Sequence, residues 1–284
     1  MFPPITPKNN GAIIQYINMQ DPKILANKEW WEKMVAEGVG FTQPWLDLDP
    51  NTVKQYAEGR LKSPPKPLDQ MFPISVLTDV KGKDVLCLAS GGGQQSAVFG
   101  ILGARVTIVD IAEGQLEGDK KTADHYGYNV TTIQGDMSDL SELKDNSFDL
   151  VFQAPSMAYV PDVKKVYSEV ARVLRSGGLY RVDAENPLSQ FIEHESVWDG
   201  QGYRITVPYT VKEKKKEGKS VTEFRHYLGE VFNGLIESGF TIEQVQESPS
   251  YNDLYGSGQT PEPGSWLHSE LYIHGAFFIL ARKK

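Results

Sequence analysis

The sequence has little of what marks secreted, metal-binding or nucleic-acid-binding proteins. Its 284 residues include one cysteine, Cys87, which excludes an intramolecular disulfide and a thiolate metal cluster. The formal net charge of −8 opposes a large phosphate-binding surface, so we expect no nucleic-acid partner. The chain also has no long apolar run and no charged-then-apolar leader. We therefore expect a soluble, cytoplasmic protein that does not associate with membranes.

The most informative segment is an apolar run that leads into three consecutive glycines. Residues 85–88 (VLCL) are apolar throughout, which is typical of a buried parallel strand. Gly91, Gly92 and Gly93 follow, and glycines at such a point let the backbone turn tightly and approach a ligand that a Cβ atom would exclude. An isolated run of glycines is most often a flexible turn, so the segments that follow decide the interpretation.

A second short strand, at residues 106–109, ends in a carboxylate. Asp110 lies nineteen residues after Gly91, and in a doubly wound sheet an acid at this place reaches the ribose of a nucleotide held over the glycine turn. The dinucleotide fingerprint G-x-G-x-x-G is incomplete, because Ser96 stands at the position of the third glycine. This difference weakens NAD as the ligand without excluding it.

Three later segments extend the pattern in chain order. Gly135, Asp136 and Met137 follow an apolar strand at 130–133, residues 148–152 form a fourth strand that opens into Gln153, and a helix ends on paired glycines before a fifth strand at 179–182. Over roughly residues 75 to 185 this order resembles the class I S-adenosylmethionine-dependent methyltransferases. The motif LCLASGGGQQ is similar to that of a bacterial branch, the UbiE-like methyltransferase domain, whose substrates are mostly undefined.

This resemblance implies a doubly wound α/β fold with a mostly parallel, seven-stranded sheet, and S-adenosyl-L-methionine as the cofactor. It implies that Asp110 binds the ribose, that Ile111 flanks the adenine, and that Asp136 and the Met137 amide bind the adenine edge. Gln153 falls where the methionine part and the methyl group are usually found. The implied cofactor-binding residues are Ala89, Ser90, Gly91, Gly92, Gly93, Gln94, Asp110, Ile111, Gln115, Asp136, Met137 and Gln153.

The chemistry of a sulfonium cofactor agrees with these residues. Such a ligand has no phosphate to neutralise, so its site requires neither a P-loop lysine nor a metal. Carboxylates suit it, because a ribose diol, an exocyclic amine and an amino group all donate hydrogen bonds. Asp183, Glu185 and Asn186 at the end of the fifth strand have the side chains of a divalent-ion site, but the rest of a metal-dependent pattern is not visible, and we expect no metal.

Two regions outside the motifs are expected to determine the substrate. Residues 1–75 are predicted to form an N-terminal cap or lid, and residues 76–284 the methyltransferase domain, in which an insertion at 184–227 covers the substrate. Both regions contain several aromatic side chains, any one of which more often packs its own segment than binds a ligand. Residues 271–281 are predicted to be the antiparallel strand that completes the sheet.

The acceptor and the catalytic base are not fixed by the sequence. We expect a small-molecule acceptor, and an oxygen or protonated nitrogen nucleophile would require a base. The weak candidates for this base are His194, His226, Tyr159 and Tyr203. Two alternatives to the methyltransferase stay open: an NAD-dependent oxidoreductase, and a nonenzymatic module that binds S-adenosylmethionine or S-adenosylhomocysteine.

Overall fold

A mostly parallel β-sheet forms the centre of the molecule. The computed structural model describes residues 14–16, 22–61, 64–190, 198–205, 207–215, 221–247 and 261–284. Within these residues the sheet has the order β1-β4-β3-β2-β5-β6-β10-β9, and β10 is antiparallel to both β6 and β9. The expected seven-stranded sheet is thereby confirmed, and the short strand β1 adds an eighth at the edge, parallel to β4.

The strands of this sheet are β1 (Ile14–Tyr16), β2 (Asp84–Leu88), β3 (Arg105–Asp110), β4 (Val130–Gly135), β5 (Phe148–Gln153), β6 (Leu174–Glu185), β9 (Phe240–Glu247) and β10 (Ala276–Lys283). A separate hairpin pairs β7 (Glu213–Lys215) with β8 (Thr222–Phe224). The α-helices are α1 (Pro22–Ala36), α2 (Pro50–Ala57), α3 (Gln95–Ile101), α4 (Glu113–Tyr126), α5 (Val163–Val173), α7 (Leu228–Glu237) and α9 (Trp266–Ser269). Short 3-10 turns are η1 (Gly40–Thr42), η2 (Leu68–Gln70), η3 (Ile74–Val76) and η4 (Met157–Tyr159).

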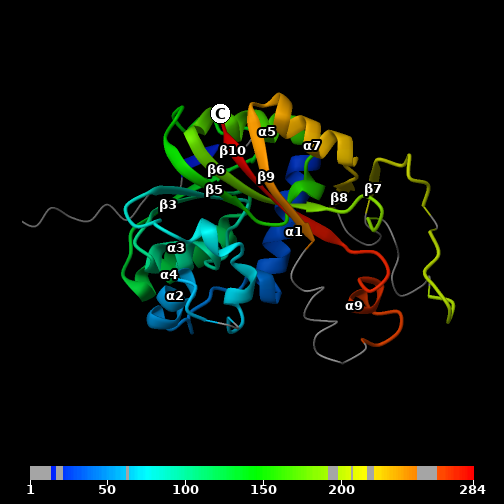
Figure 1. Ribbon diagram of the computed structural model, residues 1–284, viewed down its shortest axis with the longest axis horizontal. Coiled ribbons are helices and arrows are strands. Elements are labelled where there is room, and N and C mark those ends of the chain that lie inside the picture. Colours follow the sequence, from blue (N-terminus) through cyan, green and yellow to red (C-terminus); the bar gives the residue numbers. More distant parts are fainter. Residues whose placement is uncertain are drawn as a thin grey trace, which may run out of the picture.

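Helices cover both faces of the sheet. Figure 1 shows α5 and α7 on one face and α2, α3 and α4 on the other. Each face has its own apolar cluster, and α2, η2 and η3 from the N-terminal region contribute to the second one. Burial on both faces explains why the central strand reads as an uninterrupted apolar run rather than an alternating one. None of the helices in the described residues is long and apolar enough to cross a membrane.

The helix α5 shows how the sequence pattern becomes packing. Its buried side chains, Val163, Val166, Tyr167, Val170 and Val173, recur at helical spacing and face the sheet. The helix begins after Asp162, whose carboxylate accepts a hydrogen bond from the Lys164 amide at 2.9 Å.

The order of the strands fixes where a ligand can bind. From β2 the chain moves outward through β3 and β4 on one side, and then returns to β5 and β6 on the other side. The connections therefore diverge between β2 and β5, and in open α/β sheets ligands bind beyond the carboxyl ends of the strands at this switch point. Ser90 joins the two strand ends, since its hydroxyl donates to the Leu88 carbonyl at 3.0 Å and accepts from the Ala154 amide at 3.2 Å.

Two sequence-based expectations are wrong in detail. The final strand begins at Ala276 and not at residue 271, because the amides of Leu271 and Tyr272 bond back to carbonyls of α9 and continue its turn. In α7, the helical spacing of Leu228, Val231, Phe232, Leu235 and Ile236 predicts a face that packs on the sheet, but Leu228 and Ile236 are exposed. Only one side of this helix faces the core, at Val231 and Leu235.

Candidate active site

A cavity of about 550 Å³ opens at the carboxyl ends of β2, β3, β4 and β5. Its lining comes from the glycine turn, the ends of β3 and β4, the segment after β5, and helix α1. The lining residues are Lys23, Ile24, Asn27, Trp31, Phe41, Gln70, Ala89, Ser90, Gly91, Gln94, Gln95, Val109, Asp110, Ile111, Gln115, Gly135, Asp136, Met137, Ser138, Asp139, Ala154, Pro155, Ser156, Tyr159, Val160, Pro161, Asp162 and Lys165. Nine of the twelve predicted cofactor-binding residues are among them, and Gly92, Gly93 and Gln153 are not.

The glycine turn requires glycine for two separate reasons. Gly92 and Gly93 have φ values of +106° and +75°, a region that other residues rarely adopt. Neighbouring atoms also lie too close for a side chain. A Cβ atom on Gly93 would lie 2.4 Å from the Gly118 carbonyl oxygen, and one on Gly91 would lie 2.8 Å from the Asp110 carboxylate. The turn is therefore packed directly against β3 and α4.

Two buried carboxylates hold the turn in place. Asp110 accepts hydrogen bonds from the Gly91 amide at 2.9 Å and the Ala112 amide at 3.0 Å. Asp119, on α4, accepts from the amides of Gly92 and Gly93, both at 3.1 Å, and also bonds the Ser96 hydroxyl. Burial raises the pKa of Asp110 to about 6 and that of Asp119 to about 8. The amides of all three glycines are therefore already bonded to aspartate side chains.

Asp119 was not predicted from the sequence, although a signal for it exists. It lies on the buried face of α4 with Leu116, Thr122 and Ala123, at helical spacing. An acid in such a stripe is rarely buried unless it has hydrogen-bond partners. Because those partners lie some twenty-six residues away along the chain, the pattern indicates that Asp119 has a role without showing which segment it contacts.

Amide side chains around the turn leave acceptor atoms for a ligand. Gln95 and Gln115 both line the cavity, and their side-chain oxygens are buried without a hydrogen-bond partner among the described residues. A buried acceptor without a donor is costly, so a ligand with hydroxyl or amino groups would fit this part of the cavity. Gln94 differs from these two, because its Nε2 donates to the carbonyls of Gly40 and Gln43 and so holds the N-terminal region on the turn.

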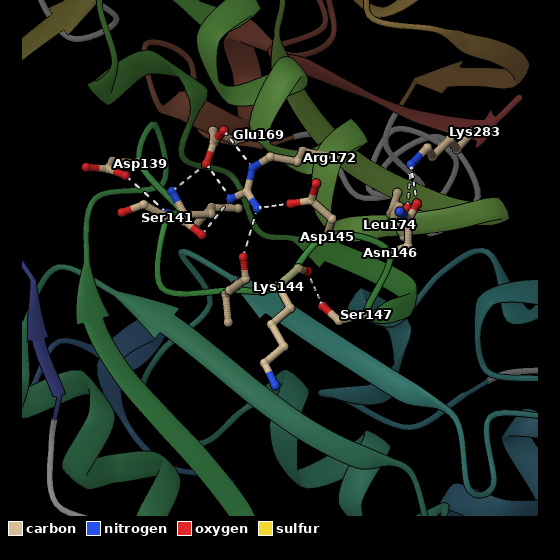
Figure 2. Close-up of polar contacts among 12 residues, drawn as sticks. Asp139, Ser141, Lys144, Asp145, Asn146, Ser147, Glu169, Arg172, Leu174 and Lys283 are labelled. Carbon is tan, nitrogen blue, oxygen red and sulfur yellow. Dashed lines mark hydrogen bonds and ion pairs between the residues drawn. The ribbon is translucent and has the colours of Figure 1, made fainter.

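Residues 136–139, in the loop after β4, line the cavity, and side chains of α5 form hydrogen bonds with the backbone of this loop. Arg172 donates to the Leu140 carbonyl at 2.7 Å and forms ion pairs with Glu169 and Asp145. Figure 2 shows this guanidinium between the two carboxylates, with the loop around it. Glu169 also accepts from the Leu140 amide at 2.8 Å, so one residue of the loop is held at both of its backbone groups. Helix α5 therefore holds the loop that begins at Asp136 through its later residue Leu140.

Gln153 ends β5 as predicted, but its side chain does not line the cavity. It is fully buried, donates to the Ser156 hydroxyl at 2.9 Å, and accepts a hydrogen bond from the Tyr180 hydroxyl. Ser156 does line the cavity. The contribution of Gln153 in this structure is therefore to hold the segment after β5.

Of the four candidates for a base, Tyr159 is the one that the described residues bring to the cavity. Burial raises its pKa, so the hydroxyl stays protonated near neutral pH. His226 is buried behind η4, where its Nε2 lies 3.0 Å from the Met157 carbonyl oxygen, and burial lowers its pKa. Tyr203 lies in a separate aromatic group, with its hydroxyl 2.8 Å from Nδ1 of His268. His194 lies outside the described residues.

The three side chains considered for a divalent ion contact different groups. Asp183 forms an ion pair with the buried Arg181, and Asn186 donates to the His274 carbonyl at 2.8 Å. Burial raises the pKa of Glu185 to about 7. No group of three or more His, Cys, Asp or Glu side chains arranged for a metal occurs in the residues that the structure describes.

Helix α1 lines the cavity and runs between η4 and the start of α4. Asn27 donates to the Tyr159 carbonyl at 2.9 Å, and Trp31 packs edge-on against the Tyr159 ring with centroids 5.5 Å apart. Glu32 reaches the start of α4, where its carboxylate accepts from the amides of Glu113 at 2.7 Å and Gly114 at 3.1 Å. A carboxylate at a helix N-terminus is stabilising, so this contact fixes α1 at the start of α4.

Comparisons with known proteins agree with this geometry. Residues 86–182 match the family described as "Methyltransferase domain". The chain is similar to the uncharacterized methyltransferase YbaJ of Bacillus subtilis, with 31% identity over 230 residues that cover 78% of this chain and 89% of that protein.

Solved structures give the same result. An S-adenosylmethionine-dependent methyltransferase from Mesorhizobium loti has 26% identity and a TM-score of 0.63, over 76% of this chain and 95% of that one. Geranyl diphosphate C-methyltransferase from Streptomyces coelicolor, solved with Mg²⁺, geranyl diphosphate and S-adenosyl-L-homocysteine, has 16% identity and a TM-score of 0.58, over 93% of this chain and 99% of that one. This second likeness concerns the fold alone.

Proposed function

Because the chain belongs to the class I S-adenosylmethionine-dependent methyltransferases, we propose that its cavity binds S-adenosyl-L-methionine and that the protein methylates a small-molecule acceptor. The finer assignment to the bacterial UbiE-like branch, based on the LCLASGGGQQ motif, is part of the same proposal. So is a cytoplasmic location, which cell fractionation would test.

The state of the glycine-turn amides is the observation that carries this proposal. A dinucleotide site offers backbone N–H groups to a diphosphate, whereas here the amides of Gly91, Gly92 and Gly93 all bond to Asp110 or Asp119. Above about pH 6, where the buried Asp110 carboxylate is ionised, its charge beneath the turn would also repel a diphosphate. A cofactor without phosphate meets neither obstacle, which favours a sulfonium nucleoside over NAD.

The residues of the cavity fit such a cofactor by their chemistry. Asp110 keeps acceptor capacity for the two ribose hydroxyls, Asp136 for an adenine amino group, and the free oxygens of Gln95 and Gln115 for further donors. When bound, S-adenosylmethionine supplies a methyl group on a sulfonium sulfur. The chain's own contribution is to align the acceptor with that group and to exclude water, which can supply much of the rate of a displacement.

We further propose that residues 1–75 act as a cap and residues 184–227 as a substrate-covering insertion on a methyltransferase domain of residues 76–284. The contacts of α1 with η4 and with the start of α4 support the first part. Trp31 gives the cap an aromatic side chain at the cavity, where it packs against Tyr159 of the methyltransferase domain. Hydrogen exchange with and without S-adenosylhomocysteine tests both segments, which should become more protected when ligand is bound.

Calorimetric titration with S-adenosylhomocysteine and NADH tests the cofactor. We expect NADH to bind at least ~100-fold more weakly, a difference of about 2.7 kcal/mol. Comparable dissociation constants would favour the oxidoreductase instead. Turnover of S-adenosylmethionine in the presence of a methyl acceptor then separates an enzyme from a module that only binds the cofactor.

A further inference from the structure

Apolar side chains of α1, η1, η4 and the two residues after η4 line one side of the cavity. We call this side the acceptor wall; it consists of Ile24, Trp31, Phe41, Tyr159, Val160 and Pro161. Trp31 lies at its centre, edge-on to both Tyr159 and Phe41, with ring centroids 5.5 Å and 5.7 Å away. Such a surface favours an apolar and preferably planar molecule.

Charged groups around the cavity are mostly acidic. Four carboxylates line it, those of Asp110, Asp136, Asp139 and Asp162, against two amines, those of Lys23 and Lys165. Lys23 forms an ion pair with Glu213 at 2.8 Å. In the part of the chain that the structure describes, no arginine lines the cavity. Phosphate groups are usually bound by arginine forks or clustered cations, so this lining disfavours a phosphorylated or otherwise anionic acceptor.

One polar side chain of the cavity lies beside the acceptor wall and has an unmet hydrogen-bonding requirement. Asn27 is 6% exposed, and its Nδ2 donates to the Tyr159 carbonyl. That bond fixes the orientation of the Asn27 side-chain amide. The Oδ1 atom of Asn27 has no hydrogen-bond partner among the described residues. A hydroxyl or amine on a bound molecule would satisfy this oxygen, whereas an ether or a carboxylate would not.

From the apolar wall, the acidic lining and this amide, we infer that the methyl acceptor is a small, ring-bearing molecule without an anionic group that donates a hydrogen bond to Asn27. The inference rests on the proposed function, because it assumes that the cofactor occupies the glycine-turn side. It narrows the acceptor to neutral or cationic hydroxy and amino compounds, such as phenols and aromatic amines, and sets phosphorylated substrates aside.

Three probes with the same ring system separate these requirements. 2-Naphthol has a donor, 2-methoxynaphthalene has none, and 2-naphthyl phosphate is anionic. Their binding is measured by Trp fluorescence and calorimetry on the full chain saturated with S-adenosylhomocysteine. We expect 2-naphthol to bind best, the ether about 10-fold more weakly because the Asn27 oxygen stays unpaired, and the phosphate at least ~10-fold more weakly. Equal or tighter binding of the phosphate, or no binding of any probe to the loaded protein, would overturn the inference.

Substitutions assign the two preferences to their residues. In Asn27→Leu the difference between 2-naphthol and its ether should disappear, while Glu29→Leu, on the exposed side of the same helix, should keep it. The isosteric double variant Asp139→Asn/Asp162→Asn should bind 2-naphthyl phosphate about 3-fold or more tightly, because two negative charges that repel the phosphate are removed. The control double variant Asp124→Asn/Glu142→Gln removes two exposed charges outside the cavity and should leave the affinity for 2-naphthyl phosphate unchanged. The assignment to Asn27 would be contradicted if Asn27→Leu still bound 2-naphthol more tightly than its ether. The assignment to Asp139 and Asp162 would be contradicted if both double variants changed phosphate affinity equally.

The cofactor itself provides the control for the underlying function. If S-adenosylhomocysteine binds and the probes behave otherwise than expected, only the inference about the acceptor is wrong. If S-adenosylhomocysteine does not bind to the unsubstituted protein, the proposed function fails first.

Discussion

The glycine-turn side of the cavity and the acceptor wall differ in how their backbone is held in place. On the first side, Asp110 and Asp119 accept hydrogen bonds from the amides of three consecutive glycines, and backbone atoms of α4 lie directly against the turn. On the second side, Asn27 joins α1 to η4 by a side-chain hydrogen bond to the Tyr159 carbonyl, and Phe41 is 56% exposed.

This difference indicates a rigid half and an adaptable half. A turn whose amides are all bonded and whose neighbours leave no space for a Cβ has one arrangement, which suits a ligand of fixed shape. A wall of aromatic rings from α1 and η4, held by a few hydrogen bonds, opens at lower cost and can accommodate an acceptor. The comparison makes predictions that can be checked in order of their expected size.

The largest effect is expected from a side chain inside the rigid half. Gly93→Ala places a Cβ 2.4 Å from the Gly118 carbonyl oxygen and forces alanine to φ +75°. Backbone strain and overpacking together should lower the free energy of unfolding by about 3 kcal/mol and abolish cofactor binding. Denaturant unfolding and calorimetry measure the two effects.

Gly127→Ala is the matched control for this substitution. Gly127 ends α4 with the same φ of +75°, but nothing lies within 4 Å of its Cβ position. Gly127→Ala should lower the free energy of unfolding by about 1 kcal/mol, because only the strain of the backbone conformation is added. Cofactor affinity should not change. If the two variants lose equal stability, close packing of the turn is not what distinguishes this half.

A second prediction concerns Asp110 and pH. Asp110→Ala should weaken S-adenosylhomocysteine binding by roughly 1 to 3 kcal/mol, because charge-assisted hydrogen bonds are lost. Since burial raises the pKa of Asp110 to about 6, its carboxylate gains a proton as the pH falls through that value. Affinity of the unsubstituted protein should therefore decrease from pH 7 to pH 5. Asp110→Asn should bind more weakly and show little of this decrease, and an equal slope in both proteins would assign the titration to another group.

The smallest effect is expected where α1 meets the start of α4. Glu32→Gln keeps the shape of the side chain but removes the charge that faces the amides of Glu113 and Gly114, at a cost of about 1 kcal/mol. Hydrogen exchange in α1 should become faster, while exchange in α4 and cofactor affinity change little. Glu29→Gln, an exposed substitution in the same helix, should change neither. Equal exchange in both variants would show that Glu32 does not hold α1.

Much of the fold and of the rigid half was predictable because the relevant patterns are local. Residues 85–88 and 106–109 show the apolar runs of buried parallel strands, and the spacing from Gly91 to Asp110 follows from one strand, one helix and the next strand. In the structure the Gly91 amide donates to the Asp110 carboxylate at 2.9 Å. The start of the final strand was predicted too early, since apolar residues in a turn after α9 look like those of a strand.

What the sequence determined by itself was the buried strands and the place of the glycine turn, because periodicity and glycine placement act over a few neighbouring residues. The seven-stranded sheet followed from the family resemblance. The tertiary structure alone decided that Asp119 bonds the turn, that Gln153 points into the core, and that Asn27 and Trp31 face the same cavity as Asp110. These contacts join segments up to about 130 residues apart in the chain, such as Asn27 and Tyr159. No local pattern specifies such pairings, since they depend on how whole elements pack against one another.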